Sequence, residues 1–269
     1  MHPRRLYAHR GASAECPENT LPAFERALEH GCDALELDVH LTRDHQLIVA
    51  HDDLATRMTG AALAWHTLEL AEAQRLDAGW GFLAPDGTRP FAGQGIYAPS
   101  FVEVLEAYPD VHLNVDLKGR TRDEGGRAAG GRGAMASEIM LALLREHDAE
   151  RRVTLASFQT KTLVEVRRQK FAGETGLAQA EVATLLALPS IVWRQLPWTG
   201  NAVQVPTHQG PLRFDRAPFI AKCHSLGLRV DYWVIDDASE AARLLELGAD
   251  GIMTNDPASI APLFHERLR

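Results

Sequence analysis

Apolar and polar positions follow one repeated pattern along most of this chain. Segments with apolar residues at helical spacing, such as residues 21–28 and 241–245, end near a glycine and lead into a short apolar run. Gly31, Gly227 and Gly248 mark three of these helix ends. Glycine readily adopts the left-handed conformation that ends a helix, and a short apolar run bounded by turns is typical of a buried strand. The pattern therefore predicts helices that alternate with buried strands.

Eight apolar runs are predicted to be strands. They span residues 6–9, 35–41, 111–118, 153–158, 176–180, 203–207, 229–235 and 251–255. Strands that alternate with helices over about 250 residues are typical of a (β/α)8 barrel. An open doubly wound sheet is the competing topology, but it usually has a glycine-rich phosphate turn after the first strand, and this chain has none there. We therefore predict an α/β protein with a (β/α)8 TIM barrel.

Two segments exceed what a minimal barrel requires. Residues 52–100 lie between the second and third predicted strands and contain the turn-rich stretch 84–90. We predict a single catalytic TIM-barrel domain over residues 1–269, with 52–100 as a small subdomain inserted after the second strand. Residues 119–133 are rich in glycine and arginine, a composition typical of flexible loops. This loop has two interpretations, a solvated insertion and a basic gate over the site.

Charge and composition exclude several functional classes. The chain of 269 residues has 36 acidic and 28 basic side chains and a net charge of -8, so it has no basic excess for nucleic acid or an anionic membrane. No apolar run approaches the roughly 18 residues of a spanning helix, and we predict a cytoplasmic protein without stable membrane association. Its three cysteines lack the spacing of a disulfide framework or a zinc site. The sequence is compatible with a homo-oligomer.

Carboxylates gather on the predicted second and third strands. Glu36 and Asp38 are two residues apart, as are Asp116 and Lys118, so each pair projects to one side of its strand. Glu36, Asp38 and Asp116 are expected to converge inside the barrel mouth, where desolvation and repulsion make three bare charges costly. One divalent cation would compensate them, and oxygen ligands favour Mg2+ or Ca2+ over zinc. The alternative is a set of structural salt bridges with Arg10 and Lys118.

Two histidines lie near the same strand ends. His9 ends the first predicted strand, and His51 follows a short apolar run after the second. A pair of imidazoles can serve phosphoryl transfer, because one deprotonates a nucleophile and the other protonates the leaving alkoxide. Arg10 and Lys118 would hold the phosphate and offset its charge in the transition state. We therefore predict His9 and His51 as catalytic residues and Arg10 and Lys118 as substrate-binding residues.

Several short motifs occur in a specific order. They are His9-Arg10-Gly11, Pro17-Glu18-Asn19-Thr20, Glu36-Leu37-Asp38-Val39, His51-Asp52, Asn114-Val115-Asp116-Leu117-Lys118, Tyr232-Trp233-Val234-Ile235, and a C-terminal run over residues 248–257. This order resembles the glycerophosphodiester phosphodiesterase family over essentially the whole chain. The resemblance implies a (β/α)8 barrel with a small insertion and metal-dependent hydrolysis of glycerophosphodiesters to sn-glycerol 3-phosphate and an alcohol. The residues it implies are the acid/base pair His9 and His51, the metal ligands Glu36, Asp38 and Asp116, and the phosphate-binding residues Arg10 and Lys118.

Two positions depart from the family pattern. The family more often has Glu where this chain has Asp116, and a ligand shorter by one methylene changes how the metal is held. The family commonly has Asp after Thr254, where this chain has Asn255. That difference leaves the role of the last strand open.

Three further residues have supporting roles in this interpretation. Glu18 and Asn19 precede the first helix, where we expect them to cap it and brace Arg10 rather than touch the substrate. Trp233 is expected to form an apolar wall for the glycerol, with core packing as the alternative.

Rival functions are separated by the residues they need. A related phosphodiesterase or lyase acting on lysophospholipids would use the same histidines and metal and yield a cyclic phosphate. A non-catalytic barrel that only binds a phosphodiester would be favoured if His9 or His51 were missing, and both are present. A metallohydrolase of the amidohydrolase kind would need His-x-His on the first strand, which His9-Arg10-Gly11 does not supply.

The long loops also bear on substrate size. Residues 52–100 and 119–133 both leave the barrel mouth, and such loops are expected to roof a site for a small soluble diester. We therefore expect deacylated esters such as glycerophosphocholine to be preferred over lysophospholipids. The opposite expectation rests on Trp80, Phe82, Phe91 and Tyr97, which could line a groove for an acyl chain.

Overall fold

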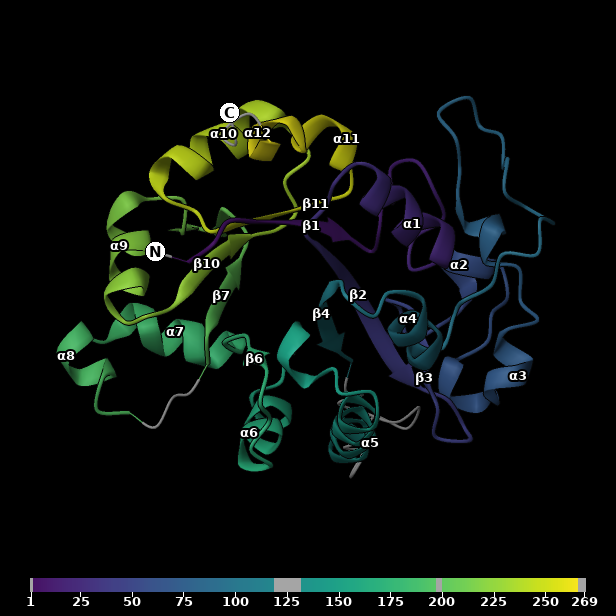
Figure 1. Ribbon diagram of the computed structural model, residues 1–269, viewed down its shortest axis with the longest axis horizontal. Helices are drawn as coiled ribbons and strands as arrows, with labels where there is room; N and C mark the ends of the chain where they lie inside the picture. Colours follow the sequence, from purple (N-terminus) through teal and green to yellow (C-terminus); the bar gives the residue numbers. More distant parts are fainter. Residues whose placement is uncertain (1, 119–131, 197–199, 266–269) are drawn as a thin grey trace.

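Parallel strands form a closed ring in this protein, whose computed structural model describes residues 2–118, 132–196 and 200–265 (Figure 1). The eight parallel strands within these residues are β1 (Arg5–His9), β2 (Ala34–Leu41), β4 (His112–Leu117), β5 (Val153–Ala156), β6 (Glu174–Thr175), β7 (Ala202–Val205), β10 (Arg229–Tyr232) and β11 (Gly251–Thr254). Each of them except β6 pairs with the next in chain order, and β11 pairs with β1. A parallel bridge between Gly176 and Ala202 joins the segment after β6 to β7 and closes the ring. The predicted (β/α)8 barrel is confirmed.

Helices cover the outside of the ring (Figure 1). They are α1 (Leu21–Glu29), α4 (Phe101–Ala107), α5 (Arg132–Glu146), α6 (Thr160–Arg168), α7 (Gln179–Ala187), α8 (Ser190–Trp193), α9 (Ala217–Ser225), α10 (Ala238–Leu247), α11 (Pro257–Ile260) and α12 (Pro262–His265), with the 3-10 turn η3 (Glu150–Arg152) before β5. Asp237 starts α10 by accepting a hydrogen bond from the Glu240 amide, and Gly248 ends it in the left-handed conformation at φ 106°. Gly31 and Gly227 also have positive φ, which confirms the predicted helix ends. Within the described ranges, no helix is long and apolar enough to cross a membrane.

Strand alternation places polar side chains inside the barrel and apolar side chains under the helices. Leu35 and Leu37 of β2 belong to the main hydrophobic core, whereas Glu36 and Asp38 line the cavity inside the barrel. The same alternation holds on β4, where Val115 lies in the core and Asp116 in the cavity. The inward direction predicted for the carboxylates is therefore confirmed.

The fifth predicted strand was placed too late in the chain. The strand predicted at 176–180 is β6 at Glu174–Thr175, and Ala180 lies in α7. The carboxylate of Glu181 accepts a hydrogen bond from the Ala178 amide at 2.8 Å, and this bond starts the helix within the apolar run. The fourth strand likewise ends at Ala156 rather than at residue 158, so Phe158 lies in the loop that follows β5.

The segment after β2 forms a separate layer beside the barrel. The short strand β3 (Leu47–Val49) pairs antiparallel with β2. The elements that follow it are α2 (Thr56–Thr59), η1 (Trp65–Thr67), α3 (Leu70–Ala73) and η2 (Ala78–Gly81). Trp65, Met58 and Ile48 belong to a hydrophobic cluster distinct from the barrel core. The division into one barrel domain with an inserted subdomain at 52–100 stays a prediction, and of the loop at 119–133 residues 119–131 lie outside the described residues.

A buried polar network fills the end of the barrel where the strands begin. The Arg229 guanidinium donates to the Asp231 carboxylate, with the Nη2 and Oδ1 atoms 2.9 Å apart, and both side chains are almost fully buried. The Tyr7 hydroxyl donates to Asp231 at 3.3 Å. Arg5 pairs with Glu174 at 3.0 Å across the same end. These pairs satisfy charges that burial would otherwise make costly.

Replacement of Arg229 by methionine should lower the free energy of unfolding by about 3–5 kcal/mol, because it leaves the buried Asp231 charge without its partner. Urea denaturation of both proteins measures the change. Arg168→Met, which removes the exposed Arg168–Glu165 pair, is the matched control and should cost clearly less. Equal losses in the two variants would contradict the assignment of a stabilising role to the buried pair.

Candidate active site

A cavity of about 790 Å3 opens at the ends of the barrel strands. The residues that line it include all eight residues predicted to catalyse, bind metal or bind substrate. These are His9, Arg10, Glu36, Asp38, His51, Asp116, Lys118 and Trp233. Glu18 and Asn19 are not among the described lining residues.

The register between neighbouring strands brings these residues together. His9 on β1 lies beside Glu36 on β2, and Glu36 lies beside Asn114 on β4. Two residues further along, Asp38 lies beside Asp116. Parallel strands in register place side chains of equal depth in one layer of the barrel. The site is therefore built in two layers, with His9 and Glu36 below Asp38 and Asp116.

His9 is held in one tautomer by the last strand. Its Nδ1 atom lies 2.7 Å from the side-chain oxygen of Asn255. The amide nitrogen of Asn255 donates to the Asp236 carboxylate at 2.9 Å, and a carboxylate only accepts, so the oxygen of Asn255 must face His9. An amide oxygen also only accepts, and Nδ1 of His9 therefore carries the hydrogen. The Nε2 atom is left 4.0 Å from Glu36 with a free lone pair when the ring is neutral.

The protonation of His9 follows from its surroundings. Burial lowers the pKa of His9 below its ordinary value, and the neighbouring charge of Arg10 lowers it further. The ring is therefore neutral near pH 7. A neutral imidazole with an available Nε2 is suited to accept a proton.

His51 is held by a carboxylate instead of an amide. Its Nδ1 atom lies 2.6 Å from Asp52. Although burial opposes ionisation of Asp52, hydrogen bonds from Arg57 and His51 lower the pKa of this carboxyl to about 2, so it is ionised and accepts the Nδ1 hydrogen. The backbone at His51 is held by the buried His40, whose Nε2 atom donates a hydrogen bond to the His51 carbonyl at 2.9 Å. Both catalytic candidates are thus fixed through Nδ1, which leaves Nε2 for chemistry.

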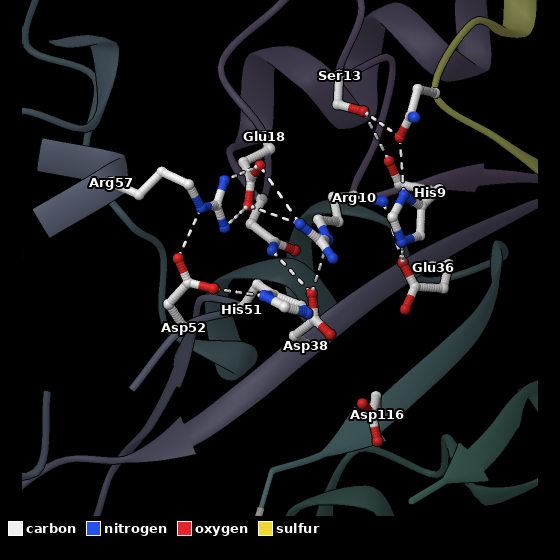
Figure 2. A network of polar contacts seen from close by, with 12 residues as sticks. His9, Arg10, Ser13, Glu18, Glu36, Asp38, His51, Asp52, Arg57 and Asp116 are labelled. Atoms are coloured by element: carbon white, nitrogen blue, oxygen red, sulfur yellow. Dashed lines mark hydrogen bonds and ion pairs between the residues drawn. The ribbon is translucent and has the colours of Figure 1, made fainter. Parts of the chain in front are cut away.

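A chain of ion pairs connects the two sides of the site (Figure 2). Arg57 donates to Asp52 through Nε at 2.6 Å and to Glu18 through both terminal nitrogens. Glu18 in turn accepts from Arg10, with Nη1 and Oε1 3.3 Å apart. The Nε atom of Arg10 lies 3.3 Å from Asp38. Arg10 is therefore oriented from one side by Glu18 and from the other by Asp38.

Glu18 and Asn19 do not cap the first helix, so that part of the expectation is wrong. The helix begins after Thr20, whose side chain donates to the Pro17 carbonyl. Asn19 has a left-handed backbone at φ 56° and donates its side-chain amide to Asp38 at 3.1 Å. The left-handed turn directs Asn19 into the barrel instead of along the helix axis.

The three carboxylates have unequal surroundings. Burial raises the pKa of Glu36 well above its ordinary range, and the charge of Asp38 raises it further. Burial also opposes ionisation of Asp38, but Lys118 and Arg10 hold the pKa of this carboxyl below its ordinary value. The pKa of Asp116 is raised by burial, although Lys118 partly offsets the effect. The site therefore has more buried acid than its two cations compensate.

Lys118 forms salt bridges with two of the three carboxylates, which is the alternative to a metal site that the sequence left open. Its Nζ atom lies 2.8 Å from Asp38 and 2.6 Å from Asp116. Burial opposes the charge of Lys118, but these two carboxylates raise its pKa above the ordinary value. Within the described ranges, no group of three or more His, Cys, Asp and Glu is arranged closely enough to hold a metal ion. Figure 2 shows Asp116 set apart from Glu36 and Asp38.

The donor chemistry nevertheless fits a hard divalent cation. Glu36 is 6% exposed, and among the described residues no Lys or Arg forms an ion pair with it. Its neighbours on the adjacent strands, Asp38 and Asp116, supply further oxygen atoms at the same cavity wall. A cation that carries only oxygen ligands is typically Mg2+ or Ca2+. The uncompensated Glu36 carboxylate is the feature that such an ion would satisfy.

Comparison with known proteins identifies the family. A model of the glycerophosphoryl diester phosphodiesterase family matches residues 9–259. A glycerophosphodiester phosphodiesterase of Caldanaerobacter subterraneus subsp. tengcongensis is 30% identical, over 96% of this chain and 96% of its own. The chain belongs to the glycerophosphoryl diester phosphodiesterase family.

Solved structures agree with this family and its fold. One from Silicibacter pomeroyi superimposes with a TM-score of 0.77 at 25% identity and covers 99% of this chain and 94% of its own. A phosphodiesterase from Oleispira antarctica, solved in complex with the product sn-glycerol-3-phosphate, has a TM-score of 0.75 at 23% identity and covers 97% and 96% of the two chains. As a member of the glycerophosphoryl diester phosphodiesterase family, this chain is an enzyme, a glycerophosphodiester phosphodiesterase.

The residues that sequence reasoning missed in this phosphodiesterase hold others in place. Three of them hold His9. Asn255 contacts His9 directly, and Asp236 accepts a hydrogen bond from the Asn255 side chain. The Ser13 hydroxyl lies 2.9 Å from the Asn255 oxygen and 3.0 Å from the His9 carbonyl. Asp52 and Arg57 act on His51 and Glu18. The adjacency of Asp52 to His51 was a usable signal. The roles of the other residues depend on contacts between distant segments, which form only when the barrel closes.

A charge exchange tests the hold on His9 in this phosphodiesterase. Asp236→Asn combined with Asn255→Asp keeps each hydrogen bond but moves the carboxylate onto Nδ1 of His9. A carboxylate in contact favours the imidazolium, so we expect the pKa of His9 to rise by roughly 1–3. The limb of the pH profile of kcat/KM that reports His9 should move to higher pH.

The single variant Asp236→Asn is the control, since it removes the charge without placing one on His9. This variant should not move the His9 limb of the pH profile to higher pH. A profile of the double variant that coincides with the wild-type profile would show that Asn255 does not hold His9.

Proposed function

We propose that this enzyme hydrolyses glycerophosphodiesters to sn-glycerol 3-phosphate and an alcohol, and that it requires one divalent cation, Mg2+ or Ca2+. The observation that carries the proposal is the pair of histidines in one cavity, each fixed through Nδ1, with His9 bound to Asn255 and His51 bound to Asp52. The substrate is a small molecule, and the product complex of the Oleispira antarctica phosphodiesterase supports sn-glycerol 3-phosphate as the product.

The two histidines have different roles in this proposal. His9 is neutral near pH 7 and accepts the proton of the attacking oxygen through Nε2. His51 then donates a proton to the oxygen of the alcohol as its bond to phosphorus breaks. The attacking oxygen belongs either to water or to the free hydroxyl of the glycerol next to the phosphate. In the second case a cyclic phosphate forms first, and water opens it with the histidine roles exchanged.

Two cations bind the phosphate in this proposal. An ammonium group has three hydrogens, and Asp38 and Asp116 accept two from Lys118. The third is available to a phosphate oxygen in the cavity. Arg10 presents its guanidinium from the β1 side, held by Glu18. Such charge-assisted bonds are stronger in the transition state, where phosphate oxygens gain charge.

The proposed metal ligands are Glu36, Asp38 and Asp116. A cation bound by them would withdraw charge from the phosphate oxygens. Lys118 already links Asp38 and Asp116, so its ammonium limits the freedom of both carboxylates. Glu36 is anchored at its other side by the backbone amide of Arg10 at 3.1 Å.

Product analysis tests the proposed function. Purified enzyme is incubated with glycerophosphocholine and glycerophosphoethanolamine in Mg2+, in Ca2+ and in chelator, and release of sn-glycerol 3-phosphate is measured. We expect release with metal and none with chelator. A cyclic phosphate as the final product would favour the lyase alternative, and binding without turnover would favour the non-catalytic barrel.

A further inference from the structure

Arg10 lines the catalytic cavity, and its neighbours leave some of its hydrogen-bond donors unused. A guanidinium has five N–H groups. The Nη1 group of Arg10 donates to Glu18 only at the long distances of 3.3 and 3.5 Å. The Nε atom lies 3.3 Å from Asp38, but it has no hydrogen-bond partner among the described residues. Arg10 therefore keeps donors for a ligand in the cavity.

Both carboxylates beside Arg10 are bound more closely by another cation. Asp38 lies 2.8 Å from the Lys118 Nζ atom, against 3.3 Å from Arg10. Glu18 accepts from both terminal nitrogens of Arg57, with Nη2 and Oε1 2.9 Å apart, against 3.3 Å from Arg10. The attraction between opposite charges falls with distance. The charge of Arg10 is therefore incompletely neutralised by its neighbours.

The guanidinium of Arg57 holds two carboxylates at once (Figure 2). Its Nε atom donates to Asp52 at 2.6 Å, and its two terminal nitrogens form a fork on Glu18. Two parallel N–H···O bonds fix both the distance and the direction of a carboxylate. Among the described residues, Glu18 forms ion pairs with Arg10 and Arg57 alone. Removal of Arg57 would leave Arg10 as the one cation for Glu18 to pair with.

Arg57 lies outside the catalytic cavity, on α2 of the inserted segment. Among the described residues that line the catalytic cavity, none comes from the 52–100 segment. The aromatic groove considered from the sequence therefore does not form there, since none of its four residues lines this cavity, namely Trp80, Phe82, Phe91 and Tyr97. Arg57 instead lines a separate cavity of about 270 Å3, together with Glu18. Arg57 therefore acts on the catalytic cavity through its carboxylate partners.

We propose that Arg57 is a positioning residue for phosphate binding, which pairs with Glu18 and so prevents this carboxylate from neutralising Arg10. The Arg10 guanidinium is then available to the phosphate oxygens. The proposal rests on the proposed function, which assigns the phosphate to Arg10 and Lys118. It also gives the inserted segment a role in the reaction, because α2 carries Arg57 to the barrel.

Binding of sn-glycerol 3-phosphate tests this role without reliance on turnover. Calorimetric titration in the presence of Mg2+ gives the dissociation constant for the wild type and for Arg57→Met. In the variant, Glu18 pairs with Arg10, and the phosphate loses a charge-assisted hydrogen bond. We expect the dissociation constant to rise by roughly tenfold.

A double-mutant cycle separates this role from a general disturbance of the structure. Glu18→Gln removes the competing charge and keeps an amide oxygen that accepts from Arg10. In the Glu18→Gln background, Arg57→Met should change the dissociation constant by less than roughly twofold. A loss caused by a disturbed fold would persist in the double variant. An equal effect of Arg57→Met in both backgrounds would overturn the proposal.

Arg43→Met is the matched control. Arg43 also contacts two carboxylates, with Nη2 3.2 Å from Glu69 and 3.1 Å from Glu72. It is exposed and is not among the described residues that line the catalytic cavity. The dissociation constant of this variant should equal that of the wild type. A rise as large as that in Arg57→Met would overturn the proposal.

The outcomes also separate this proposal from the proposed function. If the wild type hydrolyses glycerophosphocholine and Arg57→Met binds sn-glycerol 3-phosphate as tightly as the wild type, only the role of Arg57 is overturned. If the wild type hydrolyses no glycerophosphodiester but the loss in Arg57→Met and its rescue by Glu18→Gln are observed, the proposed function is overturned and the role in phosphate binding stands. A wild type that does not bind sn-glycerol 3-phosphate would overturn both.

Discussion

Replacement of His9 or His51 by alanine is expected to lower kcat by roughly 10²–10⁴-fold, the range for loss of a general acid or base. The fold should be unaffected, because both rings line the cavity and neither belongs to the hydrophobic core. Steady-state kinetics with glycerophosphocholine measures the effect. Circular dichroism and the melting temperature report the fold.

His30→Ala is a suitable control for the histidine variants. His30 also contacts a carboxylate, with Nε2 2.7 Å from Glu15, but it does not line the cavity among the described residues. Its replacement should leave kcat unchanged. Turnover near that of the wild type in His9→Ala or in His51→Ala would remove that histidine from the mechanism.

Removal of divalent metal is expected to abolish activity, and addition of Mg2+ or Ca2+ should restore it. Glu36→Gln keeps the size of the side chain and removes its charge, so we expect metal affinity to fall by at least about 10–100-fold. Calorimetric titration of the metal gives the affinity without reliance on turnover. A bound ion should also raise the free energy of unfolding, by about 2.7 kcal/mol at 100 times its dissociation constant.

Glu174→Gln is the matched control for this variant. Glu174 also lies inside the barrel, but it pairs with Arg5 at the end opposite the cavity. Its replacement should leave metal affinity as in the wild type. Full activity after exhaustive chelation, or equal metal affinity in Glu36→Gln and the wild type, would contradict the assignment of these carboxylates as metal ligands.

Local sequence patterns were sufficient to predict most of the polar site. Glu36 and Asp38 project inward because strand side chains alternate with a period of two, which needs no knowledge of the rest of the fold. His9, Glu36 and Asp116 meet because the ends of parallel strands lie at one rim of a barrel. The motif order added the family, which the comparison confirmed.

Other features depend on contacts between distant segments. Asn255 and His9 are 246 residues apart, and they meet only because β11 pairs with β1. Glu18 and Arg57 are 39 residues apart and belong to different layers. No periodicity in a single segment encodes such pairs. The start of α7 was misplaced for a related reason, because the Glu181 carboxylate overrides an apolar run that is typical of a strand.

Local periodicity and the ends of parallel strands were enough to predict the barrel, the inward direction of the carboxylates and His9 as a catalytic candidate. His51 was predicted from its place after a short apolar run, which is β3, an antiparallel partner of β2. How these groups are held depends on contacts that form only in the folded protein. The folded chain fixes the tautomer of His9 through Asn255 and links Lys118 to Asp38 and Asp116. These relations depend on strand register and on the closure of the ring, which bring together side chains that have no neighbour relation along the chain.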